Sequence, residues 1–102
     1  MKTTIQSLHF DADIKLLQFI ESKLNHLDQY LVNIHPKSTE VILKIEHSGS
    51  FKEKVVELLV SLPGLPITIK ATGKKFEEAF RKAYIQLKRL ILKYKERFVS
   101  GH

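Results

Sequence analysis

The chain has 102 residues, of which 43% are hydrophobic, and a formal net charge of +6. This length and composition suit one compact domain with a real core, and leave little room for a large enclosed active site. The absence of cysteine excludes disulfides and thiol-based metal or redox chemistry. No apolar run approaches the roughly 20 residues that span a bilayer, and no secretory signal follows Met1, so we expect a cytoplasmic protein.

A strand and a helix are predicted for the N-terminal third. Residues 2–8 are rich in side chains that favour extended backbone. Asp11 and Asp13 supply cap and first-turn carboxylates for a helix over residues 12–31, which Pro36 prevents from continuing. Apolar residues at steps of three and four predict its buried stripe: Ile14, Leu17, Ile20, Leu24, Leu27 and Leu31.

Three further strands are predicted in the middle of the chain. Residues 39–47, 54–62 and 66–72 each alternate apolar side chains with polar ones, which is typical of a half-buried strand. The apolar positions predicted to share one face of each strand are Val41, Leu43 and Ile45, then Val56, Leu58, Val60 and Leu62, and finally Ile67, Ile69 and Ala71. Residues 47–52 are interpreted as a loop. Residues 62–65, Leu-Pro-Gly-Leu, predict a type II turn that makes the last two strands a hairpin, and the preceding strand continues the meander.

The chain ends in a long helix, predicted from Thr72 or Gly73 to Phe98. Its apolar stripe is Phe76, Phe80, Ala83, Leu87, Leu90, Ile91, Tyr94 and Phe98. The element order is therefore β-α-β-β-β-α. The simplest arrangement is an α+β two-layer sandwich, in which both helices pack on one face of a four-stranded sheet and the other face stays open to solvent.

All of the surplus positive charge lies on this last segment. Residues 74–97 hold nine Lys or Arg and three Glu, a surplus equal to the whole net charge. At about 100° per residue the cations flank the apolar stripe on both sides. One flank has Lys74, Arg81, Lys88 and Lys95, and the other has Lys75, Lys82, Arg89, Lys93 and Arg97. Uncompensated charge that includes every arginine of the chain favours a polyanion-binding surface over an ordinary solvated face.

Ile85 and Leu92 lie on the outward side of the same helix, either as ordinary exposed residues or as a contact with a partner. No catalytic or metal-binding constellation is found. The five histidines have no metal-ligand spacing, the glycines form no phosphate loop, and Asp11 with Asp13 is explained by helix capping. We therefore expect no enzyme activity, cofactor, metal or small-molecule substrate. A membrane-surface role is disfavoured because the apolar stripe is needed for the core.

Several segments match one known family in order and spacing. They are Ile5–Asp13 before the first helix, Lys23–Tyr30 at its end, Glu40–Glu46 in the second strand, and Gly73 followed by Phe76–Ala79 and Leu87–Arg97 in the last helix. Together they resemble the ribosome hibernation promoting factor family, also called ribosome-associated inhibitors or sigma-54 modulation proteins, over nearly the whole chain. Ile85-Gln86 departs from the Asp-Lys that members often have there, which removes one expected cation.

The resemblance implies a non-enzymatic translation inhibitor of stress or stationary phase. Such proteins bind ribosomal RNA of the small ribosomal subunit, across the sites of messenger and transfer RNA. The predicted rRNA-binding residues are Arg81 and Lys82, with the residues that match the family's basic tail: Lys88, Arg89, Lys93, Lys95 and Arg97. Residues 1–102 resemble the short form, a single ribosome-binding domain without the dimer-forming domain, so pairing of ribosomes would need a second hibernation factor or another arrangement. The alternative is a protein-interaction module that modulates a transcription factor through its basic helix.

Overall fold

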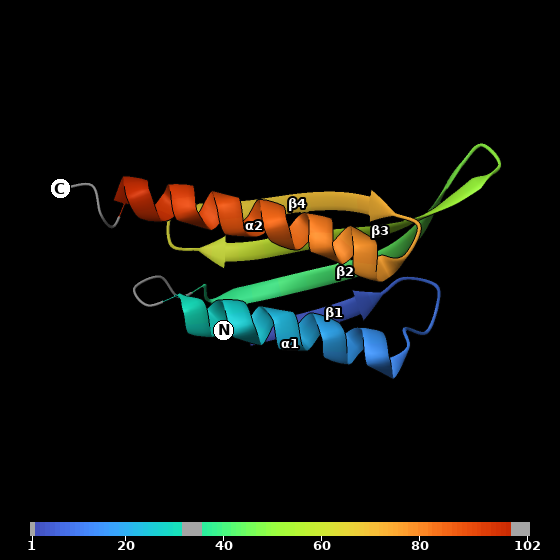
Figure 1. The fold of residues 1–102 in the computed structure, drawn as a ribbon, viewed down its shortest axis with the longest axis horizontal. Coiled ribbons are helices and arrows are strands. Elements are labelled where there is room, and N and C mark those ends of the chain that lie inside the picture. Colours follow the sequence, from blue (N-terminus) through green and yellow to red (C-terminus); the bar gives the residue numbers. More distant parts are fainter. Residues whose placement is uncertain (1, 32–35, 99–102) are drawn as a thin grey trace.

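The computed structural model describes residues 2–31 and 36–98, and has the predicted element order. Its elements are β1 (Lys2–Ser7), α1 (Ile14–Tyr30), β2 (Ser38–Ser48), β3 (Phe51–Leu62), β4 (Leu65–Gly73) and α2 (Phe76–Phe98). Two layers are visible in Figure 1, a sheet and a pair of helices on one of its faces. The predicted α+β two-layer sandwich is confirmed.

The sheet has the strand order β1-β2-β3-β4. β2, β3 and β4 form the predicted antiparallel meander, and β1 pairs with β2 in parallel after the chain has passed through α1. α1 lies along β1 and β2, and α2 lies over β3 and β4 (Figure 1). β4 is therefore an edge strand with a long helix beside it.

The hairpin between β2 and β3 is longer than the sequence indicated. Residues 47–52 were predicted as a loop, but the ladder continues to the pair Ser48 and Phe51, leaving only Gly49 and Ser50 in the turn. Gly49 has a φ of 63°, which a two-residue hairpin turn requires and glycine adopts at little cost. The Ser-Gly-Ser composition of residues 48–50 is typical of a loop, but strand pairing continues up to Ser48 and Phe51. In Figure 1 the tip of this hairpin projects beyond the helices.

α2 begins later than predicted. The prediction of a start at Thr72 or Gly73 is wrong, because β4 continues to Gly73, which pairs with Lys54 of the extended β3. A Cβ on Gly73 would lie 3.0 Å from the backbone nitrogen of Ala79, so a larger residue would push the helix from the strand. Lys74 and Lys75 consequently precede the helix instead of lying on it.

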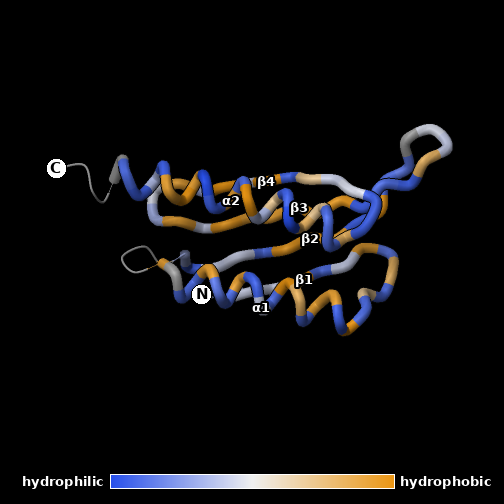
Figure 2. Tube along the Cα trace, viewed as in Figure 1, coloured by the Kyte–Doolittle hydropathy of each residue, from blue (hydrophilic) through white to orange (hydrophobic). Residues whose placement is uncertain are grey.

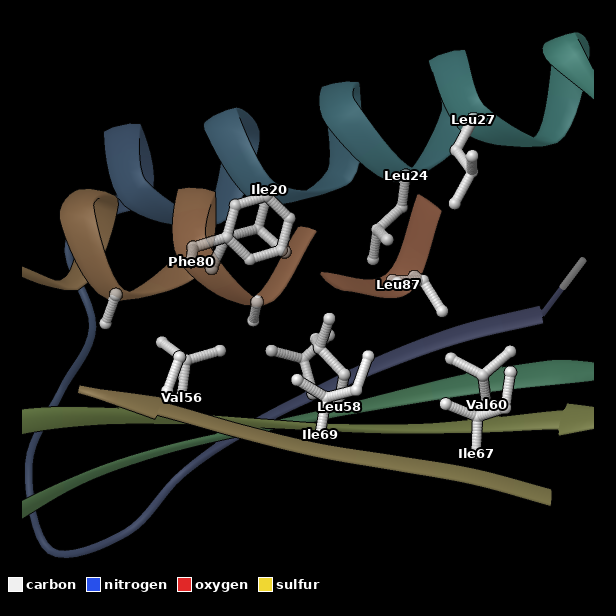
Figure 3. Close-up of a cluster of buried hydrophobic side chains, with 14 of the residues drawn as sticks. Ile20, Leu24, Leu27, Val56, Leu58, Val60, Ile67, Ile69, Phe80 and Leu87 are labelled. Atoms are coloured by element: carbon white, nitrogen blue, oxygen red, sulfur yellow. The ribbon is translucent and has the colours of Figure 1, made fainter. Parts of the chain in front are cut away.

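The core lies between the two layers and contains the inward-facing positions predicted for β2, β3 and β4. Hydrophobic and hydrophilic positions alternate along both helices in Figure 2, and in Figure 3 the helix side chains point toward those of the strands. The largest fully buried side chains include Phe80, Ile20, Leu24, Leu43, Leu58, Leu87 and Ile91.

Three stripe predictions need correction. Leu17 is only half-buried and does not belong to the core cluster. The side chain of Phe98, also predicted in the stripe, lies outside the described part of the chain. Ile14 is 62% exposed and Leu16 is buried instead, because two successive steps of three rotate Ile14 back by about 60° each from the face that holds Ile20. The helix itself begins at Ile14, and the Asp13 carboxylate accepts a hydrogen bond from Lys15 N as the N-cap. Leu90 is 38% exposed because it lies beside β4, the edge strand, beyond which no described strand covers it.

Candidate nucleic-acid interface

Five of the predicted cations of α2 point outward on the two sides of its buried stripe, as predicted. Arg81, Lys82, Lys88, Arg89 and Lys93 are exposed, and Lys95 is half-buried. Arg97 belongs to α2, but its side chain lies outside the described part of the chain. Ile85 and Leu92, exposed by 50% and 45%, face away from the core between the two flanks.

One flank faces α1 and is built around two aromatic rings. Arg81 lies over the ring of Phe19, with 5.3 Å between the guanidinium carbon and the ring centroid, and Lys23 of α1 lies over the same ring at 5.9 Å. Lys88 lies over Tyr84 at 5.5 Å. The Tyr84 hydroxyl donates to the Lys23 carbonyl oxygen at 3.1 Å, and burial raises the pKa of this hydroxyl. Cations are thus held in place by rings instead of by carboxylates.

A small hollow of about 140 Å³ opens on this flank. Its lining includes Lys23, Arg81, Tyr84 and Ile85. Two cations from two different helices converge at its rim, although they are far apart in the sequence. An anionic oxygen seated there would meet both charges, which is an arrangement suited to a phosphate.

The other flank faces β4. Lys82 is neutralised in part, because its Nζ lies 3.3 Å from the Glu78 carboxylate and donates to the Thr72 carbonyl oxygen at 3.2 Å. Arg89 and Lys93 follow on the same side. Within residues 2–31 and 36–98, no carboxylate lies at ion-pair distance from four of the predicted cations: Arg81, Lys88, Arg89 and Lys93. Their charge is available to a partner.

The open face of the sheet has a different character over β2, β3 and β4, because Lys44 and Lys70 there are paired with acids. Lys44 lies 3.4 Å from both Glu46 and Glu57, and Lys70 lies 3.1 Å from Glu46. Burial opposes the charge of Lys44, but hydrogen bonds and attraction to Glu57 and Glu46 raise its pKa. The hydrogen bond from Lys70 lowers the pKa of Glu46. The available positive charge is therefore concentrated on the helical side.

This pairing predicts the behaviour of Glu46 in acid. A carboxyl whose folded-state pKa lies below the ordinary 4.5 stabilises the fold above its unfolded-state pKa, and this contribution is lost as the pH falls through the folded-state value. We expect Lys70→Met to raise the pKa of Glu46, measured by carboxyl carbon NMR during acid titration. Lys37→Met is the control and should leave it unchanged. An unchanged Glu46 pKa in Lys70→Met would contradict the assigned cause.

The remaining candidate groups do not assemble into a site. Among the described residues no group of three or more His, Asp or Glu could hold a metal ion. His9, His26 and His47 are exposed, while His35 and His102 lie outside the described residues. No helix in the described part of the chain is both long and apolar enough to cross a membrane.

The amino-acid sequence matches a known protein family. The family model described as Sigma 54 modulation protein / S30EA ribosomal protein matches residues 3–99. The chain belongs to this family. The resemblance drawn from the sequence motifs is thereby confirmed. A sequence comparison with curated proteins gives no significant match.

Solved structures similar to this S30EA family member share its fold. A ribosomal subunit interface protein from Coxiella burnetii has a TM-score of 0.77 and 20% identity, over 93% of this chain and 98% of that one. The N-terminal domain of Protein Y from Thermus thermophilus has a TM-score of 0.76 and 19% identity, over 92% of this chain and 99% of that one.

Sequence reasoning missed two cations beside the basic helix of this S30EA family member. Lys23 shares the ring of Phe19 with Arg81, and its spacing of four residues from Phe19 in a helix was the available signal. Lys54 of β3 lies over the ring of Phe76 at 5.7 Å. Lys54 was predicted to begin a strand, but its place beside α2 depends on its pairing with Gly73 and on the later start of the helix at Phe76.

Proposed function

We propose that the protein is a non-enzymatic translation inhibitor that binds the small ribosomal subunit during stress or stationary phase. It occupies the channel used by messenger and transfer RNA and blocks it sterically. Membership of the S30EA family supports the association with ribosomes. The observation that carries the binding mode is the set of exposed cations on α2 that have no carboxylate at ion-pair distance among the described residues: Arg81, Lys88, Arg89 and Lys93.

The long helix α2 suits a contact with an RNA backbone. The 23 residues of α2 extend for about 34 Å. Positions seven residues apart, such as Arg81 and Lys88, lie about 10 Å apart on one side. Cations at this interval can follow phosphates a few nucleotides apart, and arginine binds phosphate oxygens with two donors. Ile85 and Leu92, between the flanks, are placed to contact base or sugar surface.

The seven predicted rRNA-binding residues enter the proposal with different support. Five of them are exposed, of which Lys82 shares its charge with Glu78. Lys95 and Arg97 are included because they match the family's basic tail. Lys23 joins them because it lies beside Arg81 at the rim of the hollow.

Salt dependence tests the proposed contacts. If about five phosphates are neutralised, the logarithm of the binding constant for small subunits should fall with the logarithm of salt concentration with a slope of roughly −3.5 to −4.5. Arg89→Ala with Lys93→Ala should flatten this slope by about 1.4 to 1.8 units, as measured by filter binding or light scattering. Lys2→Ala with Lys37→Ala is the control for net charge. An unchanged slope in the first variant would remove α2 from the interface.

The cellular partner is tested by sedimentation. Extracts of growing and starved cells are separated on sucrose gradients, and the protein is followed across the fractions. We expect it with small subunits and whole ribosomes after starvation. Recovery of the protein only in a ribonuclease-resistant complex without ribosomal proteins would favour the transcription-factor modulator instead.

A further inference from the structure

Among the described residues, no strand pairs with the outer side of β4. β4 pairs with β3 and forms the edge of the sheet. Along a strand, alternate residues direct their N–H and C=O groups to opposite sides. Two residues that face each other in an antiparallel pair direct these groups either toward each other or both away from each other. The carbonyl oxygen of Ser61 accepts from Lys37 N at 2.9 Å, so Ser61 points toward β2. Its partner Pro66 therefore points away from β3.

The same alternation directs the backbone groups of Thr68, Lys70 and Thr72 outward. Thr72 supports this assignment, because its carbonyl oxygen accepts a hydrogen bond from Lys82 Nζ at 3.2 Å. Pro66 also fits, since it has no N–H to leave unpaired. Among the described residues, no backbone hydrogen bond outside the helices and strands uses Thr68 or Lys70. The available edge thus runs from Pro66 to Lys70 and ends where Lys82 covers Thr72.

An apolar groove lies beside this edge. It has a volume of about 360 Å³ and is lined by residues 65–68 of β4 and by Leu90, Lys93 and Tyr94 of α2. Leu65 and Leu90 are each 38% exposed. The Tyr94 hydroxyl donates to the Pro63 carbonyl oxygen at 2.8 Å, which fixes the helix against the β3–β4 turn at one end of the groove.

The rim of the groove is positively charged. Lys93 lines it, and Arg89 lies one helical turn earlier on the same side of α2. No described carboxylate lies at ion-pair distance from either cation. A partner on this rim would therefore meet apolar surface and uncompensated positive charge side by side.

We propose that β4 and the adjacent groove bind an extended acidic peptide segment of a protein partner, which adds a fifth strand to the sheet. Its backbone pairs with Thr68 and Lys70. On the side facing α2, one apolar side chain enters the groove beside Leu90, and an acidic side chain next along that face meets Lys93 or Arg89. Backbone pairing supplies affinity, and the alternate side chains supply selectivity.

A second copy of the chain fits this edge less well. Pairing β4 with its own symmetry mate would bring Arg89 and Lys93 of each copy, which have no ion-pair partner among the described residues, to one junction of two chains that each carry +6. Like charges at such a junction oppose association. A peptide that carries carboxylates meets the same cations with attraction. Charge complementarity therefore selects the acidic segment.

Fluorescence anisotropy with a synthetic probe tests the proposal without ribosomes. The probe is a capped, labelled nonapeptide with leucine and glutamate on one face and threonine on the other, titrated with the full chain. We expect saturable binding, weakened at least about tenfold by Leu90→Glu. Ile14→Glu makes the same change at an exposed position of α1 and should bind as the native chain does. Replacing the peptide's glutamates with glutamine should also weaken binding.

A second measurement does not depend on the folding of any variant. Peptides N-methylated at every second amide are compared in the two possible registers. Strand addition predicts that one register abolishes binding and the other leaves it intact, because only alternate amides pair with β4. Equal binding of both registers, equal binding by Leu90→Glu, or self-association of the chain with no peptide binding would each overturn the proposal. Ribosome binding is measured separately, so failure here is distinct from failure of the proposed function.

Discussion

Neutralising four cations of α2 is expected to weaken binding to small ribosomal subunits by roughly 200- to 1,000-fold at 0.15 M salt. This range follows if each phosphate contact releases about 0.7 to 0.9 counterions. The variant replaces Arg81, Lys88, Arg89 and Lys93 with glutamine. These side chains are exposed and have no carboxylate at ion-pair distance among the described residues, so their loss should cost little stability. Affinity is measured by cosedimentation with purified subunits across a salt series.

The control separates the position of the charge from its amount. Lys2, Lys15, Lys37 and Lys52 are also exposed, and replacing all four with glutamine removes the same charge outside α2. We expect a much smaller loss of affinity from this variant. If both variants lost affinity equally, the protein would be attracted by its net charge alone, and α2 would have no special part in binding.

Phe80→Ala is expected to reduce the free energy of unfolding by about 3–5 kcal/mol. Phe80 is fully buried and joins both helices to the sheet. Its ring meets Phe19 of α1 edge-on, with centroids 5.8 Å apart, and stacks on Tyr84 at 5.8 Å. The truncation removes these contacts and leaves a cavity that the surrounding side chains fill only in part. Urea denaturation followed by circular dichroism measures the loss.

Ile85→Ala is the matched control for this truncation. It shortens a large apolar side chain of the same helix, but on the outward face, where Ile85 is half exposed. We expect a change of about 0.5 kcal/mol or less. A cost for Phe80→Ala no greater than that of Ile85→Ala would mean that the two helices are not joined through this ring.

Period-two alternation was enough to predict the three middle strands and their inward faces. Val41 and Leu43, for example, are fully buried as expected. The parallel pairing of β1 with β2 could not be predicted in the same way. It depends on how α1 carries the chain back across the sheet, and no local pattern in residues 2–8 records that. The turn at Gly49 was missed because its composition also suits a longer loop.

The candidate interface was predictable only within one helix. Helical spacing placed Arg81 and Lys88 on one side of α2 and Arg89 on the other. The contact of Lys23 with Phe19, and of Phe19 with Arg81, depends on how two helices distant in the sequence pack together. The groove beside β4 needed the structure too, since Leu90 was expected in the core. Whether these residues contact rRNA stays a prediction.

The two kinds of strand pairing give the molecule an uneven folding order. Tight turns join β2, β3 and β4, whereas β1 meets β2 only after α1 has intervened. Closing the longer loop costs more conformational entropy before its contacts can compensate. We therefore expect the meander and α2 to form first and β1 with α1 to dock last, which φ-value analysis would test. On this expectation the cation-bearing half of the chain assembles first, and amide hydrogen exchange should show β1 and α1 opening more readily than the meander.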